Sequence, residues 1–274
     1  MSSFREAIFI DADAFFFADP AVMLKDEQYL ATGALFFKDR NLSPENKRSW
    51  IKSILPAPIS ANVKHNRLWT GESGHMQDSG VVVVDKWRHF IPLLLTTRLN
   101  GPDRDGDVAT GKKGVYEMVF GDKETFWLSW EMTGDLDYAF HDSVSGAMGK
   151  LANSHPAEKD ENDADAVEVP GKPAKGPMVC SPQLLHFDYA GKPLWFNGWI
   201  SASKDNRTDW QDFQVYVREP PEVGKKREEN AWTIHPGNVI CLETQESSKF
   251  TSTELATLDD IMKFGKSTEA YFND

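Results

Sequence analysis

Ile8-Phe9-Ile10-Asp11-Ala12-Asp13 places two carboxylates directly after a short apolar run. An apolar run without polar alternation predicts a strand that is buried on both faces. Ligands of open α/β sheets bind beyond the carboxyl ends of such strands, and paired carboxylates there suit a divalent cation that prefers oxygen ligands. We therefore predict that Asp11 and Asp13 bind a metal ion. The alternative is an ordinary solvated turn, because Asp-x-Asp alone is a common pattern.

Two further apolar segments extend this pattern into an α/β fold. The segment from Tyr29 to Arg40 predicts a second buried strand that ends in charge, and the four valines from Val81 to Val84 predict a third. The stretch from Trp87 to Leu99 then predicts an apolar helix that packs against the sheet. This alternation of strands and helices favours a three-layer α/β/α architecture with a mixed sheet.

The composition is that of a folded domain. The chain has 274 residues, of which 40% are hydrophobic and 12% aromatic, so that a core can form. Its net charge of −12 argues against nucleic-acid binding driven by phosphate attraction. We expect a single domain over residues 1–274, in which residues 153–177, rich in acids and prolines, form a mobile surface insertion.

Cysteines and hydropathy limit the cellular context. The two cysteines, Cys180 and Cys241, are too few for a disulfide scaffold. They could form a bridge in an oxidising compartment or remain buried thiols, and we favour thiols because lone cysteines are usually buried. No run of about 18 apolar residues is present and no signal peptide is visible, so we expect no membrane-spanning segment.

The motif Gly121-Asp122-Lys123-Glu124 precedes a segment that is rich in aromatic residues and predicts a helix. In one interpretation, Asp122 and Glu124 only cap this helix, since negative charge is favoured in a first turn. Lys123 between them is disfavoured by the same helix dipole and is not explained by capping. A functional role for these three residues is therefore the competing hypothesis.

A second polar motif follows the acidic segment. His186 comes after an apolar strand and is followed by Gly191 and Lys192. These residues can supply an imidazole to a metal and an ammonium group to a phosphate. The alternative is that His186 is a structural residue held by hydrogen bonds, as most single histidines are.

Four motifs together resemble the fungal α-1,3-mannosyltransferase family, whose members extend cell-wall and glycoprotein mannan. They are Asp-Ala-Asp at 11–13, Tyr-x-x-Thr-Gly-x-Leu-Phe-Phe-x-Asp-Arg at 29–40, Asp-Ser-Gly-Val-Val-Val-Val-Asp-Lys at 78–86 and Gly-Asp-Lys-Glu-Thr-Phe-Trp at 121–127. They occur in the family's order within residues 5–200, so they are more specific than Asp-x-Asp alone. The resemblance implies a GT-A fold, Mn²⁺ or another divalent cation, GDP-mannose as the donor and retaining transfer to a mannose acceptor.

The chain is also distantly similar to glycogenin-like retaining glycosyltransferases. In that family a metal-binding His is followed by Gly and then by Lys-Pro-Trp. His186 and Lys192 have the same separation here, although Gly191 lies next to the lysine and Leu194 precedes Trp195. The family also has acids at a helix start near the reacting carbon, a position that the motif at 122–124 fits, and Asp78 stands where an Asn is usual.

These similarities and the chemistry of the residues divide the candidates by role. A bound cation would neutralise the charge that develops on the departing diphosphate. Carboxylates would stabilise an oxocarbenium-like carbon or orient the acceptor hydroxyl. We accordingly expect Asp11, Asp13 and His186 to bind the metal, Asp11, Lys123, Gly191 and Lys192 to bind the donor, and Asp78, Asp122 and Glu124 to act in catalysis.

One departure from the family pattern affects the expected activity. Enzymes of this fold place a nucleotide-binding βαβ unit before the Asp-x-Asp strand, whereas ten residues precede Asp11 here. We therefore expect a C-terminal portion of a catalytic domain that binds GDP-mannose weakly or not at all. Full-length relatives are membrane-anchored Golgi proteins, so the resemblance implies the Golgi lumen. The alternatives are an inactive paralogue that binds glycans or partners, and a metal-dependent hydrolase.

Overall fold

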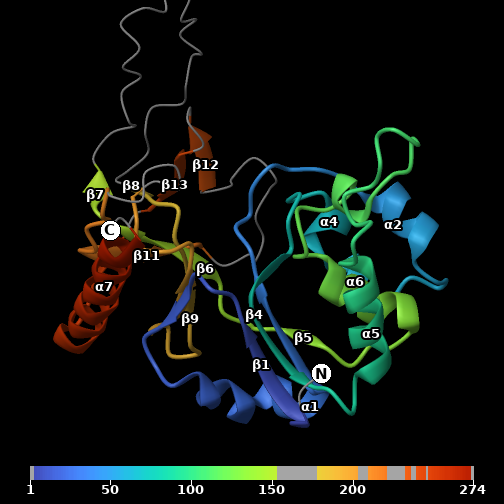
Figure 1. Ribbon diagram of the computed structural model, residues 1–274, viewed down its shortest axis with the longest axis horizontal. Coiled ribbons are helices and arrows are strands. Elements are labelled where there is room, and N and C mark those ends of the chain that lie inside the picture. Colours follow the sequence, from blue (N-terminus) through green and yellow to red (C-terminus); the bar gives the residue numbers. More distant parts are fainter. Residues whose placement is uncertain are drawn as a thin grey trace, which may run out of the picture. The chain divides into compact units, whose positions relative to one another are not determined.

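The computed structural model of the protein describes residues 3–152, 178–202, 209–220, 232–235, 239–244 and 246–272 (Figure 1). The predicted insertion at 153–177 lies outside these ranges. The chain divides into two compact units, Met1–Ser143 (unit 1) and Val144–Asp274 (unit 2). Unit 1 mixes helices with a mixed sheet, and unit 2 combines antiparallel strands with a long helix. The expected α/β class with a mixed sheet is confirmed.

The described sheet of unit 1 has the strand order β1-β4-β3-β5. Its strands are β1 (Glu6–Ile10), β4 (Gln77–Asp85), β3 (Ala34–Lys38) and β5 (Ala139–Phe140), and the short β2 (Ala14–Phe16) follows β1 in the chain. Strand β4 is antiparallel to β1 and to β3, whereas β3 is parallel to β5. Every residue of β4 is buried, which confirms the strand that the four valines predict.

Several helices of unit 1 share one core with this sheet. The helices of the unit are η1 (Pro20–Lys25), α1 (Glu27–Thr32), α2 (Arg48–Ile54), α3 (Ala61–Lys64), α4 (Arg67–Thr70), α5 (Phe90–Leu99), η2 (Val115–Glu117) and α6 (Thr125–Thr133). The core contains Phe36 of β3, Val82 and Val84 of β4, and Trp127 and Trp130 of α6. Trp130 packs edge-on against Phe36, with ring centroids 5.3 Å apart. Helix α5 lies beside α6 (Figure 1).

The prediction that the first strand is buried on both faces is wrong. Strand β1 lies at the end of the described sheet and pairs with β4 alone within it. Phe9 and Ile10 are 48% and 41% exposed. An apolar run indicates that a strand can be covered, but the number of neighbouring strands depends on contacts that the run itself does not encode.

The segment from Tyr29 to Arg40 is a helix end followed by a strand, so the prediction of one continuous strand is wrong in its first half. The side chain of Asp26 accepts hydrogen bonds from the amides of Gln28 and Tyr29 and so caps α1. Gly33 ends the helix in the left-handed conformation, with φ of 79°. Strand β3 starts at the next residue.

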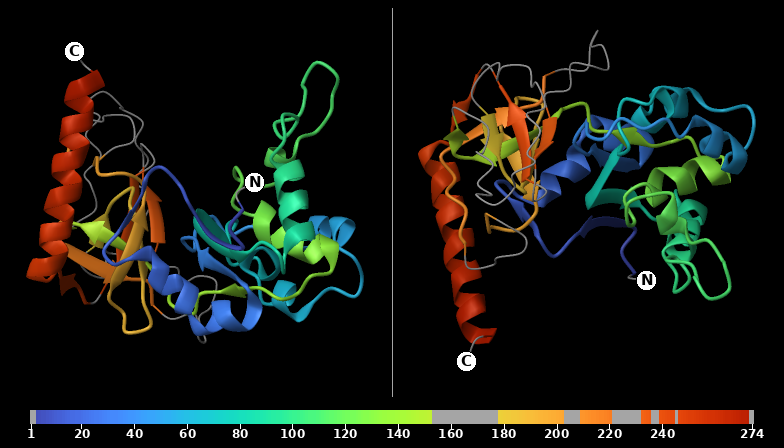
Figure 2. Two further views of the ribbon diagram at one scale, coloured as in Figure 1. Left: turned by 60° about the horizontal axis from the view of Figure 1, so that its bottom comes forward. Right: turned by 90° about the horizontal axis from the view of Figure 1, so that it is seen from above.

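Unit 2 contains two groups of antiparallel strands. In one, the neighbours are β14 (Ser248–Lys249), β11 (Val215–Arg218), β6 (Ser145–Gly149), β9 (Leu184–Phe187) and β10 (Pro193–Asn197), and in the other they are β12 (Trp232–His235), β13 (Val239–Glu243), β8 (Met178–Cys180) and β7 (Leu151–Ala152). Helix α7 (Ser252–Phe272) runs beside these strands (Figure 2). The helix approaches Ile200 closely at Gly265, where a Cβ atom added to the glycine would lie 2.1 Å from Cδ1 of Ile200.

A disulfide joins Cys180 to Cys241, so the expectation of free thiols is wrong. The two cysteines are directly paired across the neighbouring strands β8 and β13. The bond between partly buried Cys180 and fully buried Cys241 links strands whose cysteines are 61 residues apart in sequence. This pairing depends on the register of two strands that are distant in sequence, and the residues around each cysteine do not encode that register.

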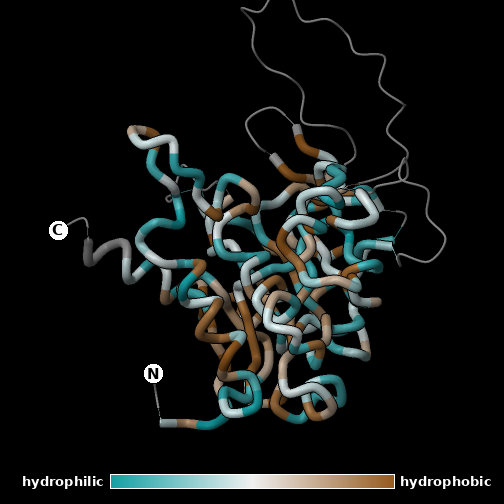
Figure 3. The backbone as a smooth tube through the Cα atoms, turned by 90° about the vertical axis from the view of Figure 1, so that its right-hand side faces the viewer, coloured by the Kyte–Doolittle hydropathy of each residue, from teal (hydrophilic) through white to brown (hydrophobic). Residues whose placement is uncertain are grey.

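Hydrophobic residues concentrate in the paired strands and packed helices, and the longer loops are mainly hydrophilic (Figure 3). Within the described ranges, no helix combines the length and the apolar character that crossing a bilayer requires. The longest described helix, α7, has 21 residues but carries exposed charges such as Asp259, Asp260 and Lys263.

Candidate active site

Strand β4 brings several of the unit 1 candidates into one region. Asp78 is part of this strand and is fully buried. The backbone amide of Asp11 donates a hydrogen bond to the carbonyl of Gly80 over 2.9 Å. The hydroxyl of Ser79 donates to Oδ1 of Asp122 over 2.7 Å. Asp78, Ser79 and Gly80 are successive residues of β4. The strand therefore brings Asp11 and Asp122, which are far apart in sequence, close to Asp78.

Lys123 forms an ion pair with Asp39, a residue outside the predicted site. Its Nζ lies 2.5 Å from Oδ2 of Asp39, which follows strand β3 and is only 3% exposed. The backbone of Asp39 is fixed as well, since its amide donates to the carbonyl of Met76 over 2.9 Å and its carbonyl accepts from Arg67. A charge directly after a buried strand, the same signal that pointed to Asp11, could have identified Asp39.

The charges in this region stabilise each other. Burial lowers the pKa of Lys123, but Asp39 and Asp78 outweigh it, so the pKa is raised above the ordinary lysine value. Burial is the largest influence on the pKa of Asp39 and raises it, but Lys123, with smaller contributions from Arg40 and His75, outweighs burial, so the pKa is lowered overall. Both groups are therefore charged near neutral pH, and the lysine compensates two buried carboxylates.

Glu124 is fully buried at the start of α6. One carboxylate oxygen accepts from the amide of Met76 over 2.8 Å, and the other accepts from Nε1 of Trp127. Burial raises its pKa to about 7, against the opposing effect of these hydrogen bonds. Glu124 thus ties the first turn of α6 to β4, and its catalytic role stays a prediction.

The variant Glu124→Gln is expected to gain stability relative to the wild type as the pH rises. The pKa of Glu124 is raised from 4.5 in the unfolded chain to about 7 in the folded one, so the fold favours the protonated form. The wild type therefore loses up to about 3 kcal/mol of unfolding free energy as the pH rises between these values, and glutamine does not. Urea unfolding of both proteins near about pH 5 and about pH 8 measures this. A stability difference that is the same at both values would contradict the raised pKa.

The second candidate motif occupies a β-hairpin of unit 2. His186, in β9, is 2% exposed, and its ring stacks on that of Trp195 in β10, with centroids 4.1 Å apart. Gly191 lies in the connecting turn with φ of 75°, a left-handed conformation that favours glycine, and a Cβ atom there would also displace the flexible end of Arg218. Lys192 is exposed next to it.

The predicted metal ligands are divided between the two units. Asp11 and Asp13 belong to unit 1 and His186 to unit 2, and their common metal site stays a prediction. Within the described part of the chain, no three His, Cys, Asp or Glu side chains are grouped as metal ligands. Asp11 is exposed, and Asp13 partly so. These accessible carboxylates offer the hard oxygen donors that a divalent cation requires.

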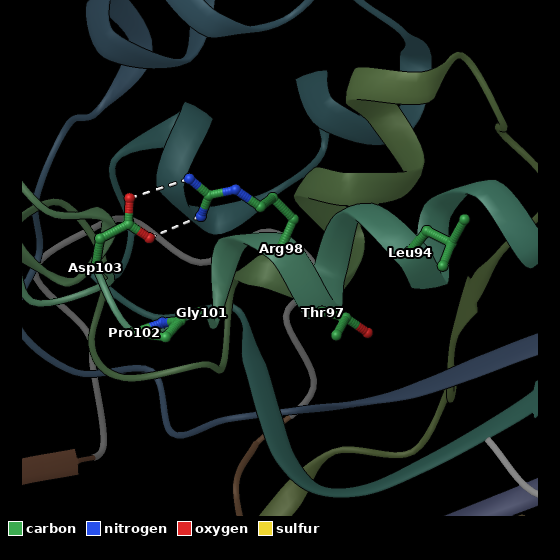
Figure 4. Close-up of a pocket in the computed structure, with 6 residues that line it drawn as sticks. All are labelled: Leu94, Thr97, Arg98, Gly101, Pro102 and Asp103. Atoms are coloured by element: carbon green, nitrogen blue, oxygen red, sulfur yellow. Dashed lines mark hydrogen bonds and ion pairs between the residues drawn. The ribbon is translucent and has the colours of Figure 1, made fainter.

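A hollow of about 600 Å³ lies elsewhere on unit 1 (Figure 4). It is lined by residues at the end of α5 and in the following turn, namely Leu94, Thr97, Arg98, Gly101, Pro102 and Asp103. Arg98 and Asp103 form a double hydrogen bond at its rim, with distances of 2.7 and 3.0 Å. None of the candidate site residues lines this hollow, so we do not assign the chemistry to it.

Comparison with known proteins identifies the class of protein to which the chain belongs. The family described as "Mannosyltransferase putative" matches residues 1–188. This match covers more than half of the chain, including Asp11, Asp78, Asp122 and His186. The chain therefore belongs to this mannosyltransferase family, which confirms the resemblance drawn from the motifs.

Individual relatives come from two yeasts. The chain is 29% identical over 221 residues to "Putative alpha-1,3-mannosyltransferase MNN15" of Candida albicans, a match that covers 75% of this chain and 26% of the relative. It is 30% identical over 231 residues to "Putative alpha-1,3-mannosyltransferase MNN13" of the same organism, covering 77% and 27%. It is 26% identical over 234 residues to "Alpha-1,3-mannosyltransferase MNT2" of Saccharomyces cerevisiae, covering 77% and 37%. The matched part of the chain thus spans between 26% and 37% of the length of these relatives.

Proposed function

We propose that the protein is a hexosyltransferase that moves mannose from GDP-mannose to a mannoside acceptor in a glycoprotein or cell-wall glycan, with retention of configuration and with a divalent cation, on a GT-A-like scaffold. The names of the relatives support mannosyl transfer. The observation that carries the proposal is the gathering of Asp11, Asp78, Asp122 and Lys123 along β4. This group combines three carboxylates with the ammonium group of Lys123, which are side chains that could bind a sugar and a phosphate.

The residues have distinct tasks in this proposal. Asp11 and Asp13, with His186, would hold the cation, which when bound supplies positive charge to the leaving diphosphate. Lys123 and Lys192 add positive charge for the donor, and Gly191 permits the tight turn beside Lys192. The carboxylates of Asp78 and Asp122 stabilise positive charge at the sugar carbon or orient the acceptor hydroxyl.

The disulfide supports a place in the secretory pathway. Disulfides form and persist in oxidising compartments and are rare in the cytosol. The bridge between Cys180 and Cys241 therefore favours a luminal site for unit 2. We propose the Golgi lumen, where mannan-extending enzymes act.

A transfer assay with the full oxidised chain tests this function. The protein is incubated with Mn²⁺, mannobiose and a large excess of GDP-mannose, because this chain is expected to bind the donor weakly, and we expect slow formation of a trisaccharide that requires the metal. The variant Asp13→Ala is expected to lose at least about 100-fold in rate, because one ligand of the charge-stabilising cation is removed. Asp19→Ala is the matched control, since Asp19 is an exposed acid that caps η1 and should leave the rate nearly unchanged.

The other outcomes separate the alternatives. Mannose release without an acceptor product would indicate a hydrolase. Binding of mannobiose without any turnover of GDP-mannose would indicate an inactive glycan-binding module. Equal rates for the wild type and Asp13→Ala would contradict the metal role of the acids.

A further inference from the structure

Phe120 presents an aromatic ring to solvent next to the candidate active site. Its side chain is 69% exposed although it is large and apolar. The ring is nevertheless held in place, since the ring of His75 meets it edge-on at 5.6 Å and Nζ of Lys123 lies 5.7 Å from its centroid. Single exposed apolar side chains are common on protein surfaces, so it is the fixed position of this ring beside polar groups, rather than its exposure, that makes it a candidate contact for a ligand.

Asp122, two residues further along, offers a hydrogen-bond acceptor close to this ring. Ser79 fixes Oδ1 of Asp122 by a hydrogen bond of 2.7 Å. No described residue donates a hydrogen bond to Oδ2, and the side chain is partly exposed. One oxygen of this carboxylate is therefore held by the protein, and the other can accept from a ligand hydroxyl.

An aromatic ring and a carboxylate together match the chemistry of a pyranose. A sugar has one face of C–H groups that packs on an aromatic ring, and hydroxyls at its edge that donate to carboxylates. A neutral sugar needs no positive charge, so the ring and the carboxylate can hold the acceptor while Lys123, which pairs with Asp39, adds positive charge for the donor.

We propose that Phe120 and Asp122 form the subsite for the terminal mannose of the acceptor glycan, with Phe120 stacking on the sugar and Oδ2 of Asp122 accepting from its hydroxyls. The proposal rests on the proposed function and adds an acceptor-recognition residue, Phe120. His75 and Lys123 position the ring, and Ser79 positions the carboxylate.

Kinetics with two substrates tests the subsite. Phe120→Ala is expected to raise the KM for mannobiose about tenfold through the lost stacking, while the KM for GDP-mannose stays the same. Phe120→Trp retains an aromatic face and should restore the KM for mannobiose. The matched control is Phe90→Ala, which removes another exposed phenylalanine of unit 1, 48% exposed, and should change neither KM.

Binding without turnover keeps this proposal separate from the proposed function. Calorimetric titration of mannobiose into the wild type and into Phe120→Ala needs no donor, and we expect about tenfold weaker binding by the variant. If transfer fails but this difference is found, the subsite stands and the transferase function does not. An unchanged affinity, an unchanged KM for mannobiose or an equal rise in both KM values would overturn the subsite. A urea midpoint of Phe120→Ala equal to that of the wild type shows that the fold is intact.

Discussion

Lys123→Met is expected to lower the free energy of unfolding by about 3–5 kcal/mol, because it removes the ion-pair partner of buried Asp39 and leaves only the weaker effect of the neighbouring Arg40 among the cations. The side chain of Asp39 is 4% exposed, and Asp78 is fully buried. Methionine fills the space of the lysine stem but brings no positive charge. Urea unfolding at neutral pH, compared with the wild type, measures the loss.

The pH dependence of this variant has a definite sign. In the wild type the lowered pKa of Asp39 adds stability above its unfolded value of 3.8, and this stability is lost as the pH falls. Without Lys123, burial raises the pKa of Asp39 instead, so the variant should recover relative to the wild type as the pH falls and the acid is protonated. A loss that does not shrink in acid would contradict this explanation.

Two further variants serve as controls for the ion pair. Asp39→Asn combined with Lys123→Met removes both charges and should recover part of the loss, since no unpaired charge is left at Asp39. Lys64→Met changes an exposed lysine at the end of α3 and should stay within about 0.5 kcal/mol of the wild type. A double variant as unstable as Lys123→Met would show that the pairing with Asp39 is not the cause.

Removing the disulfide has an expected effect of similar size. The double variant Cys180→Ser/Cys241→Ser should unfold about 4 kcal/mol more easily, because the bond closes a loop between residues 61 apart and restricts the unfolded chain. Urea unfolding of the variant, and of the wild type with a reducing agent, should give the same value. A midpoint that the reducing agent leaves unchanged would contradict the bond, provided that mass spectrometry shows reduction.

Local signals were enough to predict some parts of the molecule. Four successive valines define β4 without reference to the rest of the chain. The motifs place Asp78 and Asp122 at the site, and the structure has Asp78 in β4 and Asp122 hydrogen-bonded to the next residue of that strand, Ser79. The metal and donor roles of the individual residues stay predictions. The family motifs at 11–13 and 121–127 led to the mannosyltransferase family that the comparison shows.

Other parts depend on contacts that sequence reasoning does not reach. Tyrosine is common in strands, but the N-cap at Asp26 and the left-handed conformation of Gly33 place Tyr29 in helix α1. The charge after β3 marks Asp39 as a candidate, but its pairing with Lys123, 84 residues away in sequence, depends on the folded structure. The cysteine pair likewise required the register of β8 against β13.

The position of β1 at the end of the described sheet has a consequence for the protein in concentrated solution. On the side away from β4, the backbone of β1 can form a hydrogen-bonded ladder with a strand of another molecule, and Phe9 and Ile10 supply apolar surface for the contact. The net charge of −12 on each copy opposes such self-association through mutual repulsion. Added electrolyte screens that repulsion, so low ionic strength favours dispersed molecules and high ionic strength favours strand-to-strand dimers.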